Sequence, residues 1–346
     1  MERDDSGMVD GVARFLMPTK FSCVRWVPHQ TDDERFFVTG SWGETVNSTR
    51  LWNLAYDDQL CEANGDENAY MMGMVPKCNS THYAANEIVG LEFVDDNHVA
   101  SVTSDGVLSV LNLNRESSLS YDFSVNCTLA DLHTCCTGIA AFNQHVITAG
   151  EDGYVNIVTA DVGRVSRTIK DPDNTSIQCV AFLYPDVVVV GRQNGLIDCY
   201  DTRDPKDKPV FCVETTHKND RMLNGPTCIS LFPRNQQIAL IGLEIGSIIM
   251  WDMRNPYHAS ALICDHVSPV TDIRFACHAQ GIMFSADMNG TVSQWSVDKQ
   301  PDFIERFIER RVPRLRETRA INSMDSNNTH LLCVGDHELL FMLEFN

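Results

Sequence analysis

Cysteine and histidine are the residue types in this chain best suited to chemistry, with thirteen cysteines and eleven histidines. Cys127, His133, Cys135 and Cys136 lie close together and could in principle bind zinc. Structural zinc sites, however, use cysteines separated by two to four residues, and no such pair exists here. The sequence therefore predicts no metal site. The odd number of cysteines favours mostly buried free thiols in a reducing compartment over disulfides.

Catalytic motifs are absent as well. The sequence contains no G-x-S-x-G, no H-E-x-x-H, no P-loop and no G-x-G-x-x-G. An enzyme needs a nucleophile with a base, a carboxylate pair or a metal-ligand cluster in a pocket. We therefore expect no catalytic residues, no cofactor and no enzymatic activity. Carboxylates or metal ligands brought together only by the fold remain an open alternative.

The charge of the chain limits its partners. The formal net charge is −20, which repels phosphate backbones and argues against direct binding of nucleic acid. No apolar run reaches the roughly 18 residues that a membrane span requires. The first 20 residues lack the basic start and apolar stretch of a secretory signal. We expect an intracellular protein without membrane insertion.

Short strands joined by tight turns must position any functional residue. One turn pattern recurs at 104–106, 151–153, 193–195, 244–246 and 288–290, each time ending in glycine. These glycines are 47, 42, 51 and 44 residues apart, and glycine accepts the positive φ that such turns require. Apolar alternating runs flank every turn, and weaker copies occur at 21–54 and 319–345. Seven units of about 45 residues predict an all-β, seven-bladed β-propeller.

Tryptophan, or a substitute, ends the third strand of several units and often precedes Asp, as in Trp251-Asp252. This pattern resembles the WD40 repeat. His266, Ser285 and Trp295 occupy the positions of that family's structural hydrogen-bond network, with Asn289 where Asp is usual. Asp105 and Asp152 are interpreted as turn residues that accept backbone N–H groups, and His133 as a further blade-stabilising residue.

We interpret residues 1–346 as a single propeller. The last unit stops at its third strand, which would leave an unpaired edge prone to association. Residues 11–16, "GVARFL", have no other blade to join. They are expected to supply the fourth strand of the seventh blade and to close the ring.

Two segments interrupt the repeat. Residues 55–86 form a long acidic loop region around a short outer strand, interpreted as a solvated tether in preference to a docking site. Residues 299–319 form a basic insertion between blades six and seven. It is either an outer strand or short helix with solvated arginines, or a partner-facing patch. The candidate partner contacts are Arg310, Arg311, Arg314 and Arg316.

The segments 14–54, 146–169 and 320–338 are similar to the nucleoporin 43 family of small WD40 propellers, most specifically at Thr39–Trp42, Gly150–Gly153 and Ala320–Asp325. The resemblance implies a structural subunit of the Y-shaped outer-ring complex of the nuclear pore. The implied partners are other nucleoporins, chiefly an α-helical scaffold nucleoporin of the short arm. The implied roles are pore assembly, transport of protein and mRNA, and a kinetochore association during division.

An alternative comes from "WDMR" at 251–254, echoed by "YDTR" at 200–203. W-D-x-R is found in WD40 substrate receptors and adaptors of cullin-4 ubiquitin ligases, where the arginine faces the adaptor. Arginine at this place can equally cap its own strand.

Overall fold

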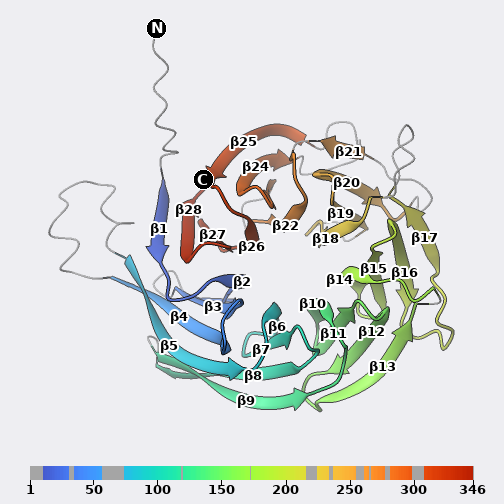
Figure 1. Cartoon of the computed structure of the whole chain (residues 1–346), viewed down its shortest axis with the longest axis horizontal. Coiled ribbons are helices and arrows are strands. Elements are labelled where there is room, and N and C mark those ends of the chain that lie inside the picture. The colour runs from blue at the N-terminus through green and yellow to red at the C-terminus, as the bar shows by residue number, and fades with distance from the viewer. Residues whose placement is uncertain are drawn as a thin grey trace, which may run out of the picture.

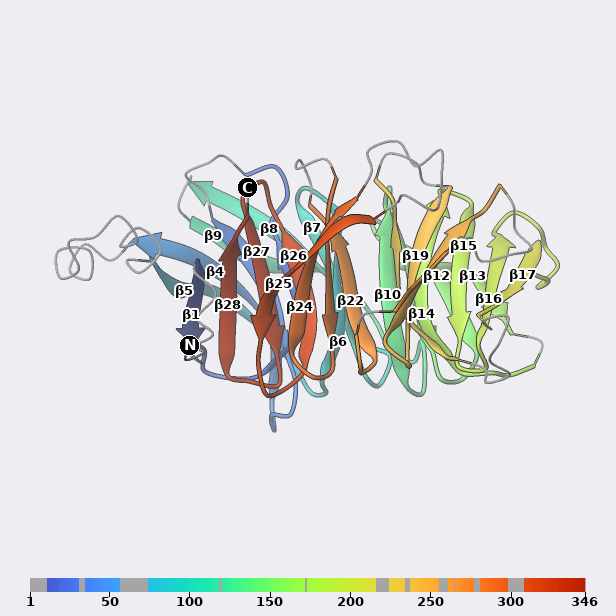
Figure 2. The same cartoon turned by 90° about the horizontal axis from the view of Figure 1, so that it is seen from above.

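The computed structural model describes residues 11–30, 35–56, 74–117, 120–171, 173–215, 224–233, 237–254, 261–264, 266–276, 281–297 and 308–345. These residues form seven antiparallel sheets of four strands each, arranged as blades around a common axis (Figure 1). Edge-on, the blades form a disc (Figure 2). The structure confirms the predicted seven-bladed, all-β propeller.

The first four blades follow chain order, each from the innermost strand outward. Blade one comprises β2 (Phe21–Trp26), β3 (Phe36–Ser41), β4 (Asn47–Tyr56) and β5 (Met74–Ala84); blade two β6 (Ile88–Asp95), β7 (His98–Thr103), β8 (Leu108–Ser117) and β9 (Ser120–Leu129); blade three β10 (Cys136–Phe142), β11 (His145–Gly150), β12 (Tyr154–Thr159) and β13 (Arg164–Lys170); blade four β14 (Ile177–Tyr184), β15 (Val187–Arg192), β16 (Leu196–Asp201) and β17 (Phe211–Glu214).

The remaining three blades complete the ring. Blade five comprises β18 (Pro226–Leu231), β19 (Ile238–Leu243), β20 (Ser247–Asp252) and β21 (Ala261–Cys264); blade six β22 (Val270–Phe275), β23 (Ile282–Asp287), β24 (Thr291–Val297) and β25 (Ile308–Arg316); blade seven β26 (Ile321–Ser326), β27 (His330–Gly335), β28 (Leu339–Glu344) and β1 (Val12–Leu16).

The hydrophobic core lies between neighbouring blades. The second and third strands are covered by a blade on each face, so β19 and β20 are buried at every residue, as expected for strands covered on both sides. The outer strand β13 instead alternates between exposed residues and residues that are half-buried or buried. Each core cluster spans two blades; in one, Trp52 of blade one packs with Leu332 and Val334 of blade seven.

The ring is closed by the N-terminal strand. β1 pairs antiparallel with β28, with Val12 opposite Leu343 and Leu16 opposite Leu339, and the two strands lie side by side in Figure 1. Phe15 packs against the core cluster shared by blades one and seven. The predicted closure is therefore confirmed.

Polar side chains on the innermost strands connect successive blades. Each stands at the second position of its strand and donates to the backbone carbonyl at the first position of the next blade. The described bonds are Ser22 to Ile88, Thr137 to Ile177, Thr227 to Val270, Thr271 to Ile321 and Asn322 to Phe21. They join five of the seven blade pairs. Sequence analysis did not predict this ring of bonds. A polar residue recurs at the second position of these innermost strands, and that recurrence could have indicated it.

Buried thiols fill the space beside small residues of the second strands. At Gly242, an added Cβ would lie 2.6 Å from the Sγ of Cys228 and 2.8 Å from the Cβ of Val270 in the next blade. Burial raises the pKa of the Cys228 thiol to about 12, which keeps it protonated. This half-buried cysteine therefore packs as a small apolar residue between blades five and six.

The two interrupting segments contribute outer strands. Residues 74–84 of the segment 55–86 form β5, and residues 57–73 lie outside the described residues. Residues 308–316 of the segment 299–319, predicted as an insertion between blades six and seven, form β25 of blade six, because Leu315 fits the core there. The predicted apolar positions 303, 304 and 307 lie outside the described residues. Among the residues described, no helix has the length and apolar character needed to cross a membrane.

Candidate protein-binding surface

The predicted hydrogen-bond network of blade six exists and is buried. His266 lies before β22, Ser285 on β23 and Trp295 on β24; the Nε2 of His266 is 2.6 Å from the Oγ of Ser285, and the Nε1 of Trp295 donates to the same Oγ at 2.8 Å. The acid of this network is Asp287, whose carboxylate is 2.9 Å from the Nδ1 of His266. The network ties three segments of one blade together.

Asn289 does not take the acid position predicted for it. Asp287 ends β23 and is buried beside His266, whereas Asn289 lies in the turn that follows and is exposed. Burial raises the pKa of the Asp287 carboxyl, but hydrogen bonds from His266 and from the backbone of Thr291 and Asn289 outweigh it, so the pKa is below the ordinary value. Asp287 is therefore an anionic acceptor near neutral pH.

Blade three repeats this arrangement with different residues. The Nδ1 of His133 is 3.1 Å from the carboxylate of Asp152, and its Nε2 is 2.9 Å from the Oγ1 of Thr148. Val158 takes the place of Trp295, and Asn156, opposite Thr148 as Ser293 is opposite Ser285, donates from its Nδ2 to the carbonyl of Leu132. Asp152 also accepts the backbone N–H groups of Thr134 and Tyr154, as expected of a turn residue, and the stabilising role of His133 stays a prediction.

Asp105 lies in the turn of blade two, as predicted. Its carboxylate accepts the hydroxyl of Thr103 and the amide of Asn86. It therefore holds the turn and the preceding loop together.

Blade four carries a buried ion cluster that sequence analysis missed. Arg192, 3% exposed, donates to Asp198, which is fully buried, and pairs with Asp171 at 3.0 Å and Asp173 at 3.1 Å. The hydroxyl of Tyr200 also donates to Asp198, at 3.3 Å. Arg192 ends the second strand of its blade, as Asp287 does in blade six, and Asp171 lies before the innermost strand, as His133 and His266 do in their blades. In the sequence, the cluster was indicated locally only by Asp198, a carboxylate inside the otherwise apolar strand 196–201.

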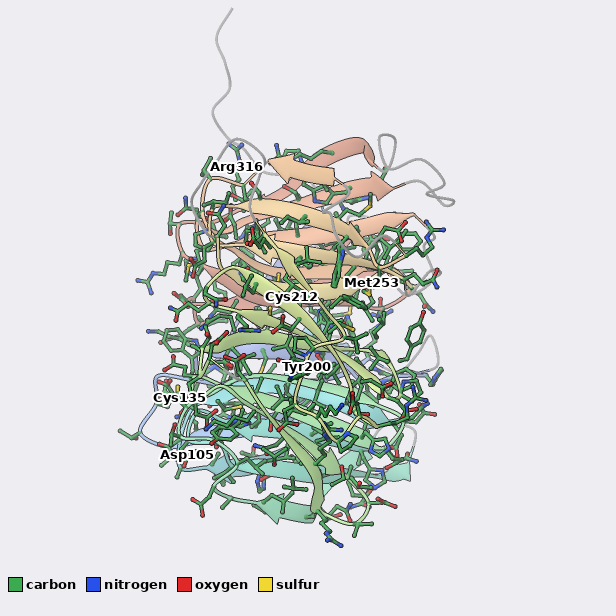
Figure 3. All side chains as sticks on the ribbon, turned by 90° about the vertical axis from the view of Figure 1, so that its right-hand side faces the viewer. Asp105, Cys135, Tyr200, Cys212, Met253 and Arg316 are labelled. Carbon is green, nitrogen blue, oxygen red and sulfur yellow. The ribbon has the colours of Figure 1, made fainter. Side chains whose placement is uncertain are left out.

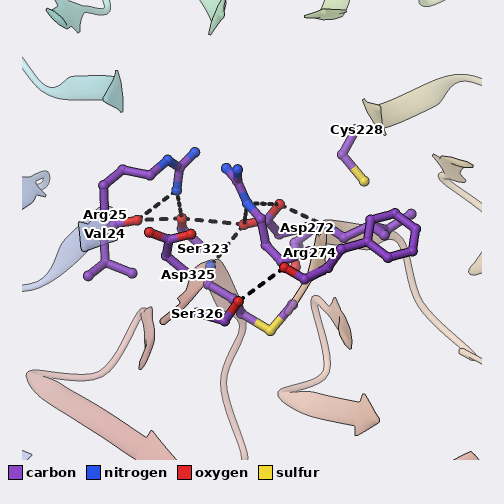
Figure 4. Close-up of polar contacts among 12 residues, drawn as sticks. Val24, Arg25, Cys228, Asp272, Arg274, Ser323, Asp325 and Ser326 are labelled. Carbon is purple, nitrogen blue, oxygen red and sulfur yellow. Dashed lines mark hydrogen bonds and ion pairs between the residues drawn. The ribbon is translucent and has the colours of Figure 1, made fainter. Parts of the chain in front are cut away.

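Charged side chains also meet in the central channel, on the innermost strands of blades one, two, six and seven. Figure 4 shows the members from blades one, six and seven: Arg25, Asp272, Arg274 and Asp325. Glu92 of β6 accepts from Arg25 of β2 at 2.8 Å and from Arg274 of β22 at 3.4 Å. Arg274 also pairs with Asp272 at 3.3 Å. Asp325 of β26 accepts the backbone N–H of Trp26 at 2.7 Å. The described carboxylates of the channel are thus engaged with arginines or backbone donors.

The electrostatics of this channel cluster follow from burial and pairing. Burial raises the pKa of the Glu92 carboxyl. The attraction of Arg25 and Arg274 lowers it by more, so the pKa lies below the ordinary value. Burial dominates at Asp325 and raises the pKa of its carboxyl. Among the residues described, no three His, Cys, Asp or Glu side chains are arranged to hold a metal ion.

The four candidate partner contacts lie on β25 and differ in their surroundings. Arg311 donates to the Oγ of Ser293 at 3.2 Å and lies 5.8 Å from the ring centroid of Trp295. Arg314 donates to the carbonyl of Glu344 in blade seven, and burial lowers the pKa of its guanidinium. Arg316 is exposed near the turn of blade six. Arg310 lies on the same strand. Their role as partner contacts stays a prediction.

The arginines of the two W-D-x-R-like endings lie against their own aspartates. The Nε and Nη2 of Arg254 are 2.9 and 2.6 Å from the carboxylate of Asp252. Arg203 makes the same contacts with Asp201, at 3.0 and 2.7 Å. This geometry is that of a residue capping its own strand.

Comparison with known proteins gives consistent results. A family model described as "Nucleolar protein 10-like, N-terminal domain", a β-propeller, matches residues 132–335. Nucleoporin Nup43 of Homo sapiens is 24% identical over 289 residues, covering 80% of this chain and 73% of the relative. Nucleoporin Nup43 of Mus musculus has the same identity and coverage. Since the family model spans more than half of it, this Nup43-like WD40 chain belongs to the nucleolar protein 10-like β-propeller family.

Proposed function

We propose that this protein is a structural subunit of the Y-shaped outer-ring complex of the nuclear pore. The observation that carries the proposal is the similarity to nucleoporin Nup43, which extends over 80% of the chain. Its partners would be other nucleoporins, chiefly an α-helical scaffold nucleoporin of the short arm. It would act at the nuclear pore in the nuclear envelope, supporting pore assembly and the transport of protein and mRNA. The kinetochore association stays a prediction.

The geometry supports a rigid binding platform without enzymatic activity. The polar groups most able to do chemistry are engaged within the fold: His266 with Asp287, His133 with Asp152, and Glu92 with two arginines. Buried polar networks that are well satisfied rigidify a core. Partner binding would then use loops and edges that the ring holds in place.

The cullin-4 receptor or adaptor function has less support. Arg254 is paired with Asp252 at 2.6 Å and Arg203 with Asp201 at 2.7 Å, although both arginine side chains are about half exposed or more. Capping of the strand ends accounts for both arginines.

Affinity purification of the tagged full-length protein, followed by quantitative mass spectrometry, tests the proposal. We expect stoichiometric recovery of the outer-ring nucleoporins, unchanged by Arg254→Ala. Arg164→Ala, which changes an exposed arginine on the outer strand of blade three, serves as the matched control. Recovery of a ligase adaptor in place of nucleoporins, lost in Arg254→Ala and kept in Arg164→Ala, would establish the alternative.

A further inference from the structure

Three large apolar side chains are exposed on adjacent loops of blades five and six. Ile245 is 49% exposed, Val267 85% and Met288 54%. The backbone places these loops in contact, because the N–H of Met288 donates to the carbonyl of Pro269 and a Cβ added at Gly246 would lie 2.3 Å from the carbonyl oxygen of His266. Val267 therefore stands between the other two. Contiguous exposed apolar residues of this kind mark interaction sites.

The fold does not require apolar residues at these positions. In the equivalent turns of blades two and three, the residue before glycine is Asp105 or Asp152, each making hydrogen bonds within its blade. Blade five carries Ile245 at that place, and blade six carries Met288 one position earlier. Aspartate stabilises such a turn through hydrogen bonds, which an exposed isoleucine side chain cannot make. The turn itself therefore does not explain the isoleucine.

Positive charge borders the same loops. Arg316 lies opposite Thr291 at the end of β25, and the N–H of the following residue, Glu317, donates to the carbonyl of Gly290 in the turn of blade six. Arg319 is exposed two residues further on. Figure 3 shows Arg316 toward the face that carries Asp105 and Cys135, whereas Met253 lies toward the opposite face.

The described carboxylates near these loops have partners of their own. Arg319 donates to the backbone carbonyl of Asp336 at 3.3 Å, while the carboxylate of Asp336 accepts the amide of Asn322 at 2.9 Å. Asp287 is buried against His266, and Glu317 pairs with Arg14 at 3.1 Å. Glu244, exposed beside Ile245, lies at the far side of the three apolar residues. The apolar residues thus have a basic border toward blade seven, in a protein whose net charge is −20.

We propose that Ile245, Val267 and Met288, with Arg316 and Arg319, form a docking surface, the blade five–six patch, for an acidic segment of another protein. Apolar side chains of that segment would cover the three exposed residues, and its carboxylates would pair with the two arginines. The argument is charge complementarity, since an acidic segment is repelled by most of this molecule and attracted where arginines gather. The inference rests on the proposed function only in taking the ligand to be a protein.

Site-specific photo-crosslinking in the full chain tests the blade five–six patch. A benzoylphenylalanine at position 267 should capture a partner peptide whose sequence is apolar and net acidic. The same probe at position 162 is the matched control, because Val162 is 67% exposed on a turn of blade three outside the patch. An adduct at 267 no more abundant than at 162, a net basic peptide, or a second copy of this chain would each overturn the proposal.

The arginines are tested in the same assay. The double variant Arg316→Glu, Arg319→Glu should lower the yield of the adduct at 267 about fivefold or more, since two attractive pairs at the border become repulsive. Arg164→Glu, a reversal of equal charge on blade three, should leave the yield unchanged. Equal yields from the two variants would contradict the proposal.

The identity of the captured protein tests the nucleoporin assignment separately. An acidic peptide from a protein that is not a nucleoporin would support the patch and contradict that assignment.

Discussion

Ser285 illustrates how single polar residues hold a blade together. An ionised carboxylate only accepts hydrogen bonds, so the Nδ1 of His266 donates to Asp287. The Oγ of Ser285 shares a hydrogen bond with the Nε2 of His266 at 2.6 Å and accepts the indole N–H of Trp295 at 2.8 Å. Ser285 thus links His266 and Trp295, so that the bonds of the network depend on one another.

Replacing Ser285 should therefore destabilise the protein. Ser285→Ala leaves the Nε2 of His266 and the Nε1 of Trp295 without this partner in a buried site, and we expect a loss of about 2–3 kcal/mol in the free energy of unfolding. Urea unfolding followed by tryptophan fluorescence measures it. Ser296→Ala, at a half-buried serine of the same blade, should change the free energy by less than about 0.5 kcal/mol. Equal losses from both would show that the network contributes nothing specific.

At the scale of elements, a four-stranded blade is stable because both faces of its inner strands pack on neighbours, while its last strand covers an open edge. β1 performs this task for blade seven, where it pairs with β28 over five residues and places Phe15 against the shared core. Arg14 adds an ion pair to Glu317 of blade six at 3.1 Å. The N-terminal strand thus joins the two ends of the ring.

Removing this strand should weaken the ring. Deletion of residues 1–17 exposes the edge of β28 and part of the core, and we expect the melting temperature to fall by roughly 5–10 °C, with more association through the open edge. Deletion of residues 1–10, which spares β1, is the matched control. Calorimetry and light scattering measure the two effects. The same melting temperature for both deletions would contradict a closing role for β1.

At the scale of the whole molecule, the central channel is asymmetric. Its charged side chains come from blades one, two, six and seven, which flank the point where the ring closes. The facing strands of blades three to five carry mainly apolar and small residues, such as Ile139 and Val180. Charge pairs in the channel therefore connect blades that are distant in the sequence.

Glu92 is the centre of that connection. Glu92→Gln would leave Arg25 and Arg274 close together with one fewer counter-charge, and we expect the free energy of unfolding to fall by about 2 kcal/mol. This is below the usual cost of breaking a buried pair because a quarter of the Glu92 side chain is exposed. Glu44→Gln, at an exposed turn of blade one, should have almost no effect. A urea midpoint equally unchanged in both variants would refute the role of Glu92.

Local patterns along the chain determine the architecture of the ring. Turn glycines at regular intervals and apolar runs between them fix strands and hairpins, because the φ of a turn and the alternation of a strand depend on a few consecutive residues. The resemblance to the WD40 repeat implied the network positions of His266, Ser285 and Trp295. Even the closing role of residues 11–16 was predictable, since the last unit lacked one strand.

Only the tertiary structure decided which polar residues meet. Asp287 and Asn289 differ by two positions, and the end of β23 rather than the turn brings a carboxylate to His266. Arg25, Glu92 and Arg274 lie on three blades, so no sequence interval relates them. The exposed residues 245, 267 and 288 likewise become neighbours through the packing of two blades. A repeat specifies each blade from short-range geometry, whereas contacts between blades depend on how the closed ring orients them.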